Sequence, residues 1–201
     1  IYRALRSVNP SPFMYYMDLD DHYVVGASPE LLVQVEDQAI TSVPIAGTRR
    51  RGDTVDKDIE IEHELLSDPK ENAEHIMLLD LARNDVGRVS EPGSVEVVEY
   101  MDIKKFSHVM HIVSKVTGKK RKDVSALEVF KACFPAGTVS GAPKIRAMQI
   151  ISDLENDKRG PYAGALGLFD FFGNIEVCIT LRTLLIKNGI ASVQSGGGIV
   201  Y

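Results

Sequence analysis

The sequence predicts an α+β fold in which antiparallel β-sheets pack against helices. Strand-like segments occur in pairs joined by short polar turns, whereas helical periodicity is concentrated in the middle of the chain. The 201 residues are 44% hydrophobic and 25% charged, which is ordinary globular composition and sufficient for a substantial core. We therefore expect one domain spanning residues 1–201.

The first part of the chain is predicted to form two β-hairpins. Residues 15–19 and 22–27 alternate apolar and polar side chains around an Asp-Asp turn. Residues 31–35 and 39–44 repeat this alternation around a Glu-Asp turn. Each pair has the two-residue side-chain period of a strand with one buried face.

A long helical segment follows the hairpins. Apolar residues recur at helical spacing between residues 58 and 86. Pro69 is expected to open the second part of this segment as a first-turn proline, capped by Ser67 or Asp68. Gly87 suits the position that follows a helix end.

The next elements are two strands and a short helix. Residues 95–100 and 109–116 are strand-like. Residues 125–133 open with a Ser-x-x-Glu capping box formed by Ser125 and Glu128, which predicts a helix start.

The C-terminal part is predicted to be a loop, a helix and a closing antiparallel meander. A loop of small residues at 135–143 precedes a helix that ends near residue 155. Residues 164–171, 175–183 and 190–194 then alternate as strands, separated by glycine-containing turns.

Charge and composition exclude several classes of function. The formal net charge of −5 argues against a broadly basic surface for nucleic acid or anionic lipid. No apolar run is long enough to cross a membrane and no targeting segment is visible, so we expect a soluble cytoplasmic protein. Cys133 and Cys178 lie in apolar stretches and are expected to be buried free thiols, with a single disulfide as the alternative.

The two ends indicate a fragment. The chain begins at Ile1 rather than at a methionine, and residues 198–201 resemble part of a strand. We expect a longer protein truncated at both ends, so that any site completed by other segments is incomplete in this chain.

Two carboxylates on the long helix are candidate metal ligands. Glu71 and Glu74 are three residues apart and therefore share a helix face. Such a pair suits a hard divalent cation such as Mg²⁺, although a solvated acidic face has the same spacing. The adjacent His75 also permits a metal hydrolase built on these three residues, but Glu71 stands where the zinc-protease pattern has its first histidine.

Other candidates are a histidine, an arginine and three loops. His108 and His111 are three apart in a strand and should face opposite sides, so they should not share a metal. Arg182 is a cation in an otherwise apolar strand, and either a carboxylate ligand or a salt bridge would neutralise it. The loops, each of which is also compatible with a structural turn, are the arginine run 49–51, the small-residue loop 137–144 and the glycine run 195–198.

Taken together, six segments closely resemble the chorismate-binding enzymes. These segments are residues 44–48, 70–85, 109–111, 137–144, 179–183 and 194–200. The strings KENAEHIMLLDLARND at 70–85 and GTVSGAPK at 137–144 are the most specific. The resemblance spans essentially the whole chain, in order.

The resemblance implies a dicarboxylate substrate, chorismate, and a Mg²⁺ cofactor. Glu74 matches a metal-ligand position, and Glu71 lies at or beside one. The family's other main metal glutamate falls beyond Tyr201. The substrate-binding positions implied by the resemblance are Gly47, Thr48, Tyr162, Arg182, Gly196, Gly197 and Gly198.

The resemblance also implies the catalytic positions. Glu30 matches the acid that protonates the departing 4-hydroxyl, and His111 matches the histidine that assists proton loss at C2 and departure of pyruvate. Thr138 occupies a third catalytic position in the small-residue loop. Ammonia attacks C2 in the first step, and elimination then forms the aromatic ring.

One residue favours a branch of the family. Aminodeoxychorismate synthases commonly carry a nucleophilic lysine where this chain has Ala46, so alanine favours the anthranilate synthase branch. That branch implies a glutamine amidotransferase partner and feedback inhibition by tryptophan at Pro12, Phe13 and Met14. Another chorismate-utilising enzyme, such as an isochorismate or salicylate synthase, and a catalytically inactive structural fragment are the alternatives.

Overall fold

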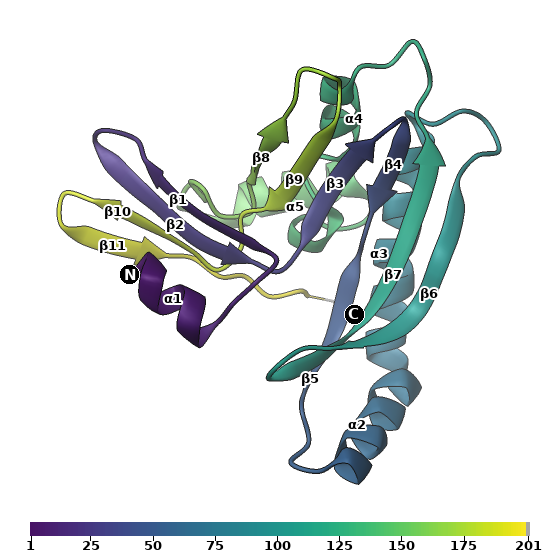
Figure 1. The fold of residues 1–201 in the computed structure, drawn as a ribbon, viewed down its shortest axis with the longest axis horizontal. Coiled ribbons are helices and arrows are strands. Elements are labelled where there is room, and N and C mark those ends of the chain that lie inside the picture. Colours follow the sequence, from purple (N-terminus) through teal and green to yellow (C-terminus); the bar gives the residue numbers. More distant parts are fainter. Residues whose placement is uncertain (200–201) are drawn as a thin grey trace.

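Two antiparallel β-sheets organise the chain in the computed structural model, which describes residues 1–199 (Figure 1). A four-stranded sheet lies on one side of the molecule, and a seven-stranded sheet backed by helices lies on the other. Every strand pair is antiparallel in the described part of the chain. The predicted α+β class is confirmed.

The smaller sheet combines the first hairpin with the last. Its strands, in spatial order, are β1 (Phe13–Asp18), β2 (His22–Ser28), β10 (Thr183–Lys187) and β11 (Ile190–Val193). A short helix, α1 (Tyr2–Val8), lies beside β1 and β2. The sequence analysis did not identify α1, and it placed the start of β10 inside one long strand at 175–183, which is wrong.

The larger sheet is built around its longest strand, β7. Its strands are β3 (Leu31–Glu36), β4 (Ala39–Ser42), β5 (Ile45–Arg50), β6 (Glu96–Lys105), β7 (Val109–Lys119), β8 (Ala165–Phe169) and β9 (Ile175–Ile179). Strand β4 pairs with the C-terminal half of β7 and β5 with the N-terminal half, while β6 pairs along the opposite edge. Strands β6 and β7 are each longer than predicted.

The predicted N-terminal caps are confirmed, whereas Gly87 is the last residue of its helix and not the position after its end, which is Arg88. Helix α2 spans Val55–Ser67 and helix α3 spans Pro69–Gly87. Between them, the Asp68 carboxylate accepts the backbone N–H groups of Lys70 and Glu71, so Asp68 rather than Ser67 is the cap. Ser125 and Glu128 form the expected capping box of α4 (Ala126–Cys133).

Helix α5 and its preceding loop also follow the prediction. The loop contains one 3₁₀ turn, η1 (Gly137–Val139), and α5 covers Lys144–Leu154. Lys144 Nζ lies 2.7 Å from Asp85 Oδ2 on α3, and both side chains are largely buried. Lys144 is therefore held by a structural ion pair with Asp85 and is not directed at an anionic ligand.

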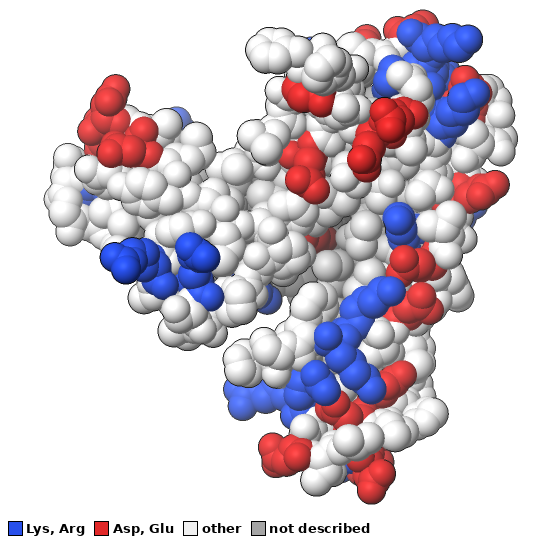
Figure 2. Space-filling view, viewed as in Figure 1, with Lys and Arg blue, Asp and Glu red and all other residues white. Residues whose placement is uncertain are grey.

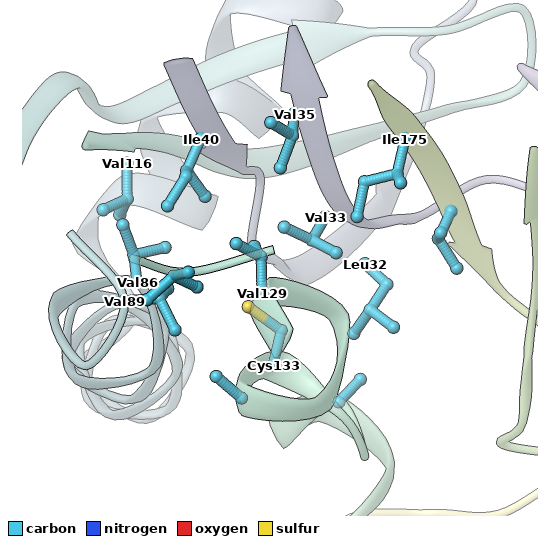
Figure 3. Packing of buried hydrophobic residues seen from close by; sticks show 14 of the residues in the cluster. Leu32, Val33, Val35, Ile40, Val86, Val89, Val116, Val129, Cys133 and Ile175 are labelled. Atoms are coloured by element: carbon cyan, nitrogen blue, oxygen red, sulfur yellow. The ribbon is translucent and has the colours of Figure 1, made fainter. Parts of the chain in front are cut away.

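The main core lies between the larger sheet and helices α3 and α4 (Figure 3). Figure 3 shows Val33 and Ile40 of the sheet facing Val86 of α3 and Val129 of α4, and all four side chains are fully buried. Burying an aliphatic side chain of this size contributes about 1.5–3 kcal/mol. Cys133 lies in this cluster as a buried free thiol, and Cys178 is buried and free elsewhere, as predicted.

Charged side chains join the edge of the sheet to α2. Lys104 pairs with Glu99 along β6, and Lys105 of β6 pairs with Glu62 of α2, each with an N–O distance of 2.7 Å. Figure 2 shows acidic and basic side chains next to one another over this region. No helix within residues 1–199 has both the length and the apolar character needed to cross a bilayer.

The chain crosses between the two sheets at two neighbouring points. Pro29 and Glu30 connect β2 to β3, and residues 180–182 connect β9 to β10. Backbone hydrogen bonds tie the crossings together: Ile179 N–H donates to Glu30 O at 3.1 Å, and Ala27 N–H donates to Arg182 O at 3.2 Å. This junction places Glu30 and Arg182 at the boundary between the sheets.

Candidate functional site

A cleft of about 420 Å³ opens at the junction of the two sheets. Its size is within the usual range for small-molecule sites. Five of the residues expected from the sequence line it together: Glu30, Thr48, His111, Tyr162 and Arg182. These residues come from segments far apart in the chain, so the fold assembles the site.

His111 lies in β7 with one ring nitrogen fixed by the neighbouring strand. Its Nδ1 is 3.1 Å from the carbonyl oxygen of Gly47 and 2.9 Å from Thr48 Oγ1. Because a carbonyl only accepts hydrogen bonds, Nδ1 carries the proton and Nε2 is left with a lone pair. Burial lowers the pKa of His111, the hydrogen bond to Gly47 partly opposes that shift, and the charge of Arg182 adds a smaller lowering. The imidazole is thus neutral and able to accept a proton.

Gly47 makes this arrangement possible by interrupting the strand pairing. The register of β5 against β7 shifts between Ala46 and Thr48, and Gly47 has a φ of 69°. Only glycine adopts this left-handed conformation readily. The resulting bulge turns the Gly47 carbonyl toward His111, as bulges beside active sites often do.

Glu30 is a buried carboxyl group on the other sheet crossing. It is only 7% exposed, and desolvation raises the pKa of Glu30 to about 8. The nearby Thr138 hydroxyl opposes that shift, although no hydrogen bond of good geometry joins the two groups. Glu30 is consequently protonated at neutral pH and can donate a proton.

Thr138 lies behind Glu30 and does not line the cleft. Both residues border a separate, smaller cavity of about 40 Å³ between β3, α3 and the loop before α5. Within the described residues Thr138 Oγ1 is buried without a hydrogen-bond partner. Thr138 therefore lies beside the carboxyl group of Glu30, and its catalytic role stays a prediction.

Arg182 occupies the bend between β9 and β10 and not the interior of a strand. Its φ of 48° breaks the pairing, and its side chain is exposed at the cleft, so the expectation of a buried arginine is wrong. In the described part of the chain its guanidinium has no carboxylate partner. The salt-bridge alternative therefore fails, and the cation can bind an anionic ligand.

The glycine run crosses from the smaller sheet toward α3 (Figure 1). A Cβ atom added to Gly196 would lie 2.7 Å from the Tyr162 hydroxyl, and one added to Gly198 would lie 3.5 Å from Glu74 Oε1. Gly197 has open space around it. The absence of side chains thus lets this backbone pass close to the cleft. The strand predicted at 198–201 includes residues 200 and 201, which lie outside the described residues.

Glu71 and Glu74 face the same region from α3. Glu71 Oε1 lies 3.2 Å from Arg49 Nη1, and its other oxygen would lie 3.3 Å from a Cβ added to Gly47. Glu74 has no ion-pair partner among residues 1–199. The two carboxylates therefore lie beside the bulge and the glycine run.

The metal-hydrolase alternative is contradicted by the position of His75. This side chain is fully buried, with Nε2 2.7 Å from Ser114 Oγ, and burial lowers the pKa of His75. It is a core residue that faces no solvent. Residues 1–199 contain no group of three or more His, Cys, Asp or Glu side chains arranged to bind a metal.

The arginine run is neither a solvated loop nor a ligand clamp. Arg49 forms ion pairs with Glu64, Asp68 and Glu71, and so ties β5 to α2 and α3. Arg51 pairs with buried Asp58, whereas Arg50 is exposed. Two of the three arginines are thus structural.

The remaining predicted positions lie away from the cleft. Phe13 and Met14 begin β1, and Phe13 packs against the small core cluster of the smaller sheet, while Pro12 precedes the strand and is exposed. His108 is exposed in the turn before β7, as expected from its spacing to His111.

Several cleft residues were not identified from the sequence. These are Pro29, Ile45, Leu181, Val193 and Gln194, together with Ala46, which was considered only for the branch of the family. Gln194 directly precedes the glycine run 195–198, whose first residue, Ser195, also lines the cleft. That adjacency could have identified Gln194. The aliphatic residues carry no signal that separates a cleft wall from a core.

The chain is similar to chorismate-utilising proteins. The family described as chorismate binding enzyme matches residues 1–201. Anthranilate synthase component 1 of Aquifex aeolicus is 57% identical over 200 residues, which are 100% of this chain and 40% of that protein. The crystal structure of anthranilate synthase component I from Streptococcus pneumoniae is similar with a TM-score of 0.87 and 47% identity, covering 94% of this chain and 42% of that one.

The similarity in fold extends further than the similarity in sequence. The menaquinone-specific isochorismate synthase MenF of Escherichia coli has a TM-score of 0.76 at 22% identity, covering 86% of this chain and 39% of that one. At this identity the likeness concerns the fold alone. The chain spans about 40% of the length of the curated relatives it matches.

Proposed function

The chain belongs to the chorismate-binding enzymes, and on that premise we propose that it supplies the chorismate site of an anthranilate synthase component I. The proposed reaction converts chorismate and ammonia to anthranilate and pyruvate. One observation carries this proposal: a single cleft is lined by the buried carboxyl group of Glu30 and by the imidazole of His111, whose Nδ1 donates to the Gly47 carbonyl and leaves Nε2 free. Such a pair can serve as acid and base in one site.

The first step requires an acid, and Glu30 is suited to supply it. Ammonia forms a bond to C2 of the ring, both ring double bonds shift by one position toward C4, and the C4–O bond breaks. The new ammonium group then gives one proton to solvent. The departing hydroxyl takes the Glu30 proton and leaves as water, so the carboxyl group becomes a carboxylate. Ala46 lines the cleft where other branches of the family carry a lysine nucleophile, which favours direct attack by ammonia.

The second step requires a base, and His111 is suited to be that base. Nε2 takes the proton from C2, the electrons of the C–H bond enter the ring, and the C3–O bond to the enolpyruvyl group breaks. The ring becomes aromatic, and enolpyruvate departs and takes up a proton at its CH2 carbon to become pyruvate. The Gly47 carbonyl holds Nδ1–H, and so keeps the Nε2 lone pair available for this step.

The substrate carboxylates have two matching sets of groups. Arg182 offers a guanidinium at the edge of the cleft, and Tyr162 offers a hydroxyl beside Gly196. Thr48 and Gly47 form the wall next to His111. We assign the enolpyruvyl carboxylate to Arg182, because an arginine fork matches carboxylate geometry.

The donor set also fits Mg²⁺. The carboxylate oxygens of Glu74 have no ion-pair partner in the described chain. Glu71 lies beside Gly47, and Arg49 pairs with one of its oxygens. Carboxylate oxygens are the donors that Mg²⁺ prefers. When bound, the ion would neutralise and orient the ring carboxylate. Glu74 would be the principal ligand, with Glu71 next to it.

Replacing Arg182 with glutamine is expected to raise the KM for chorismate by about 10-fold to 100-fold, because a hydrogen bond to a charged group contributes about 1.5–3 kcal/mol. Steady-state kinetics should be measured in a component I polypeptide of the relatives' full length that contains this chain, here called the parent enzyme. Lys187→Gln, which removes an exposed cation on β10 away from the cleft, is the control. An unchanged KM would make Arg182 a structural residue.

Replacing Glu74 with glutamine is expected to weaken Mg²⁺ binding and to slow both chemical steps, because an amide is a poorer ligand than a carboxylate. Titration calorimetry of the parent enzyme with Mg²⁺ tests the first effect independently of activity. Asp80→Asn, which removes one carboxylate at an exposed position on the same helix, is the control. Identical Mg²⁺ titrations of Glu74→Gln and the parent enzyme would exclude Glu74 as a ligand.

We also propose the partners and location of the parent enzyme. A glutamine amidotransferase would supply ammonia, which is in keeping with the designation component 1 of the relatives. Tryptophan would inhibit through a site that includes Pro12, Phe13 and Met14, and the cytoplasm would be the compartment. Binding assays with tryptophan on a Met14→Ala variant would test the inhibitor site.

Product analysis tests the proposed function as a whole. The parent enzyme should consume chorismate with an ammonium salt and Mg²⁺, and chromatography should show anthranilate and pyruvate in equal amounts. Isochorismate, salicylate or 4-amino-4-deoxychorismate as the product would assign another reaction of the family. Chorismate left unconsumed by the parent enzyme would contradict the proposed function.

A further inference from the structure

An aromatic ring stands against the imidazole of His111 on the side of the β6–β7 turn. The ring centroids of Phe106 and His111 are 5.5 Å apart, with an interplanar angle of 61°, which is an edge-to-face contact. Phe106 is 39% exposed, so its ring is not part of the core. The Phe106 ring packs against His111. The hydrogen-bond contacts of Thr48 and Gly47 fix the imidazole only at Nδ1.

The turn that carries Phe106 is anchored by Arg51. Arg51 Nη1 donates to the Phe106 carbonyl at 2.7 Å, and Arg51 N–H donates to the His108 carbonyl at 3.1 Å. The turn therefore hydrogen-bonds to the end of β5, beside which it lies (Figure 1). A single arginine holds both ends of the Phe106–His108 turn.

Asp58 in turn fixes the orientation of Arg51. Its carboxylate accepts Arg51 Nε at 2.8 Å, pairs with Arg51 Nη2, and accepts the Gly52 N–H at 2.7 Å. Asp58 is buried at the start of α2, and Arg51 lowers the pKa of Asp58. The pair is therefore ionised across the neutral pH range.

We propose that Phe106 and Arg51 are positioning residues for His111: Arg51, oriented by Asp58, holds the β6–β7 turn so that Phe106 keeps the imidazole in the orientation that bonds Nδ1 to Gly47. This inference rests on the proposed function only for its kinetic consequence. The distribution of the torsion angle about the Cβ–Cγ bond of histidine is broad. Packing against the ring therefore determines how much of the time Nδ1 donates to the Gly47 carbonyl.

Other groups also act on the imidazole. Arg182 and Glu30 face it across the cleft, Thr48 flanks it on β5, and Lys104 is its register partner on β6. The Lys104 ammonium is engaged by Glu99 at 2.7 Å. These groups remain in place when Phe106 is changed, so a Phe106 variant isolates the contribution of ring packing.

Nuclear magnetic resonance of the imidazole nitrogens in this chain is the direct test. In the unmodified chain His111 should show one neutral tautomer, with the proton on Nδ1. Phe106→Ala and Arg51→Gln should each give a mixture of tautomers, and should move the pKa of His111 toward its ordinary value. Arg50→Gln, at the exposed neighbour of Arg51, should leave both readouts unchanged, and His111→Gln assigns the signal.

A kinetic readout in the parent enzyme separates this inference from the proposed function. Phe106→Ala should slow conversion of the isolated aminated intermediate on the order of 10-fold to 100-fold, as for a misplaced catalytic group, with the KM for chorismate nearly unchanged. A tautomer change without slower conversion would support the positioning and count against His111 as the base. An unchanged tautomer and an unchanged titration of His111 would overturn the positioning role. If Phe106→Ala does not fold, Phe106→Leu, which keeps the apolar volume but lacks the ring edge, provides the same test.

Discussion

The His111→Ala variant of the parent enzyme is expected to consume chorismate and accumulate the aminated intermediate, 2-amino-4-deoxyisochorismate, instead of releasing anthranilate. Amination needs ammonia and the Glu30 proton, and His111 supplies neither. Elimination needs a base at the C2 proton, and general-base assistance contributes roughly 10²–10⁴-fold to a rate. Chromatography after incubation with chorismate, an ammonium salt and Mg²⁺ measures both products.

His108→Ala is the matched control for this variant. His108 is exposed three residues earlier in the chain, so its removal should leave both steps unchanged. Anthranilate formed by His111→Ala at the parental rate would contradict the assigned role. Failure of that variant to consume chorismate would also contradict it, because His111 would then be needed for the first step or for binding.

The Glu30→Gln variant is expected to lose amination by roughly 10²–10⁴-fold, because glutamine has the shape of the acid but no proton to give. Chorismate should still bind, since Glu30 is not assigned to a substrate carboxylate. The consumption of chorismate, followed by its absorbance, measures the effect. Glu36→Gln, at an exposed position on β3, controls for the loss of one carboxylate. Amination by Glu30→Gln within a few-fold of the parental rate would exclude this acid.

The pH dependence of amination should report the same group. Because burial raises the pKa of Glu30 to about 8, its protonated and active form is present below that pH and is lost above it. The kcat/KM for chorismate should therefore be level around neutral pH and fall by about tenfold per pH unit well above 8. Glu30→Gln should abolish this alkaline limb. A limb that persists in the variant would belong to another group.

Local signals in the sequence predicted the starts of α3 and α4 correctly, whereas α2 begins at Val55, three residues before the predicted position. The Asp68 and Ser125 caps bond N–H groups only two or three residues away, so the pattern contains both partners. Helix α1 has neither a side-chain cap nor a buried residue, so neither capping nor periodicity indicates it. Strand β10 was merged with β9 because the left-handed conformation of Arg182, uncommon for a residue with a side chain, has no signature in an apolar run.

The candidate site could be predicted only in part, and for the same reason. The resemblance identified Glu30, His111 and Arg182, which line one cleft. Their protonation states depend on burial and on contacts such as Gly47 O to Nδ1, which only the folded chain creates. Phe106 had no signal at all, because its contact with His111 depends on the exact length of the β6–β7 turn.

Supplying purified 2-amino-4-deoxyisochorismate to both variants tests the division of labour between acid and base most directly. The account predicts that Glu30→Gln converts this intermediate to anthranilate at close to the parental rate, because the acid has no part in elimination. It predicts that His111→Ala converts it roughly 10²–10⁴-fold more slowly. Equal losses in the two variants, or normal conversion by His111→Ala, would contradict the assignment of the two steps to these two residues.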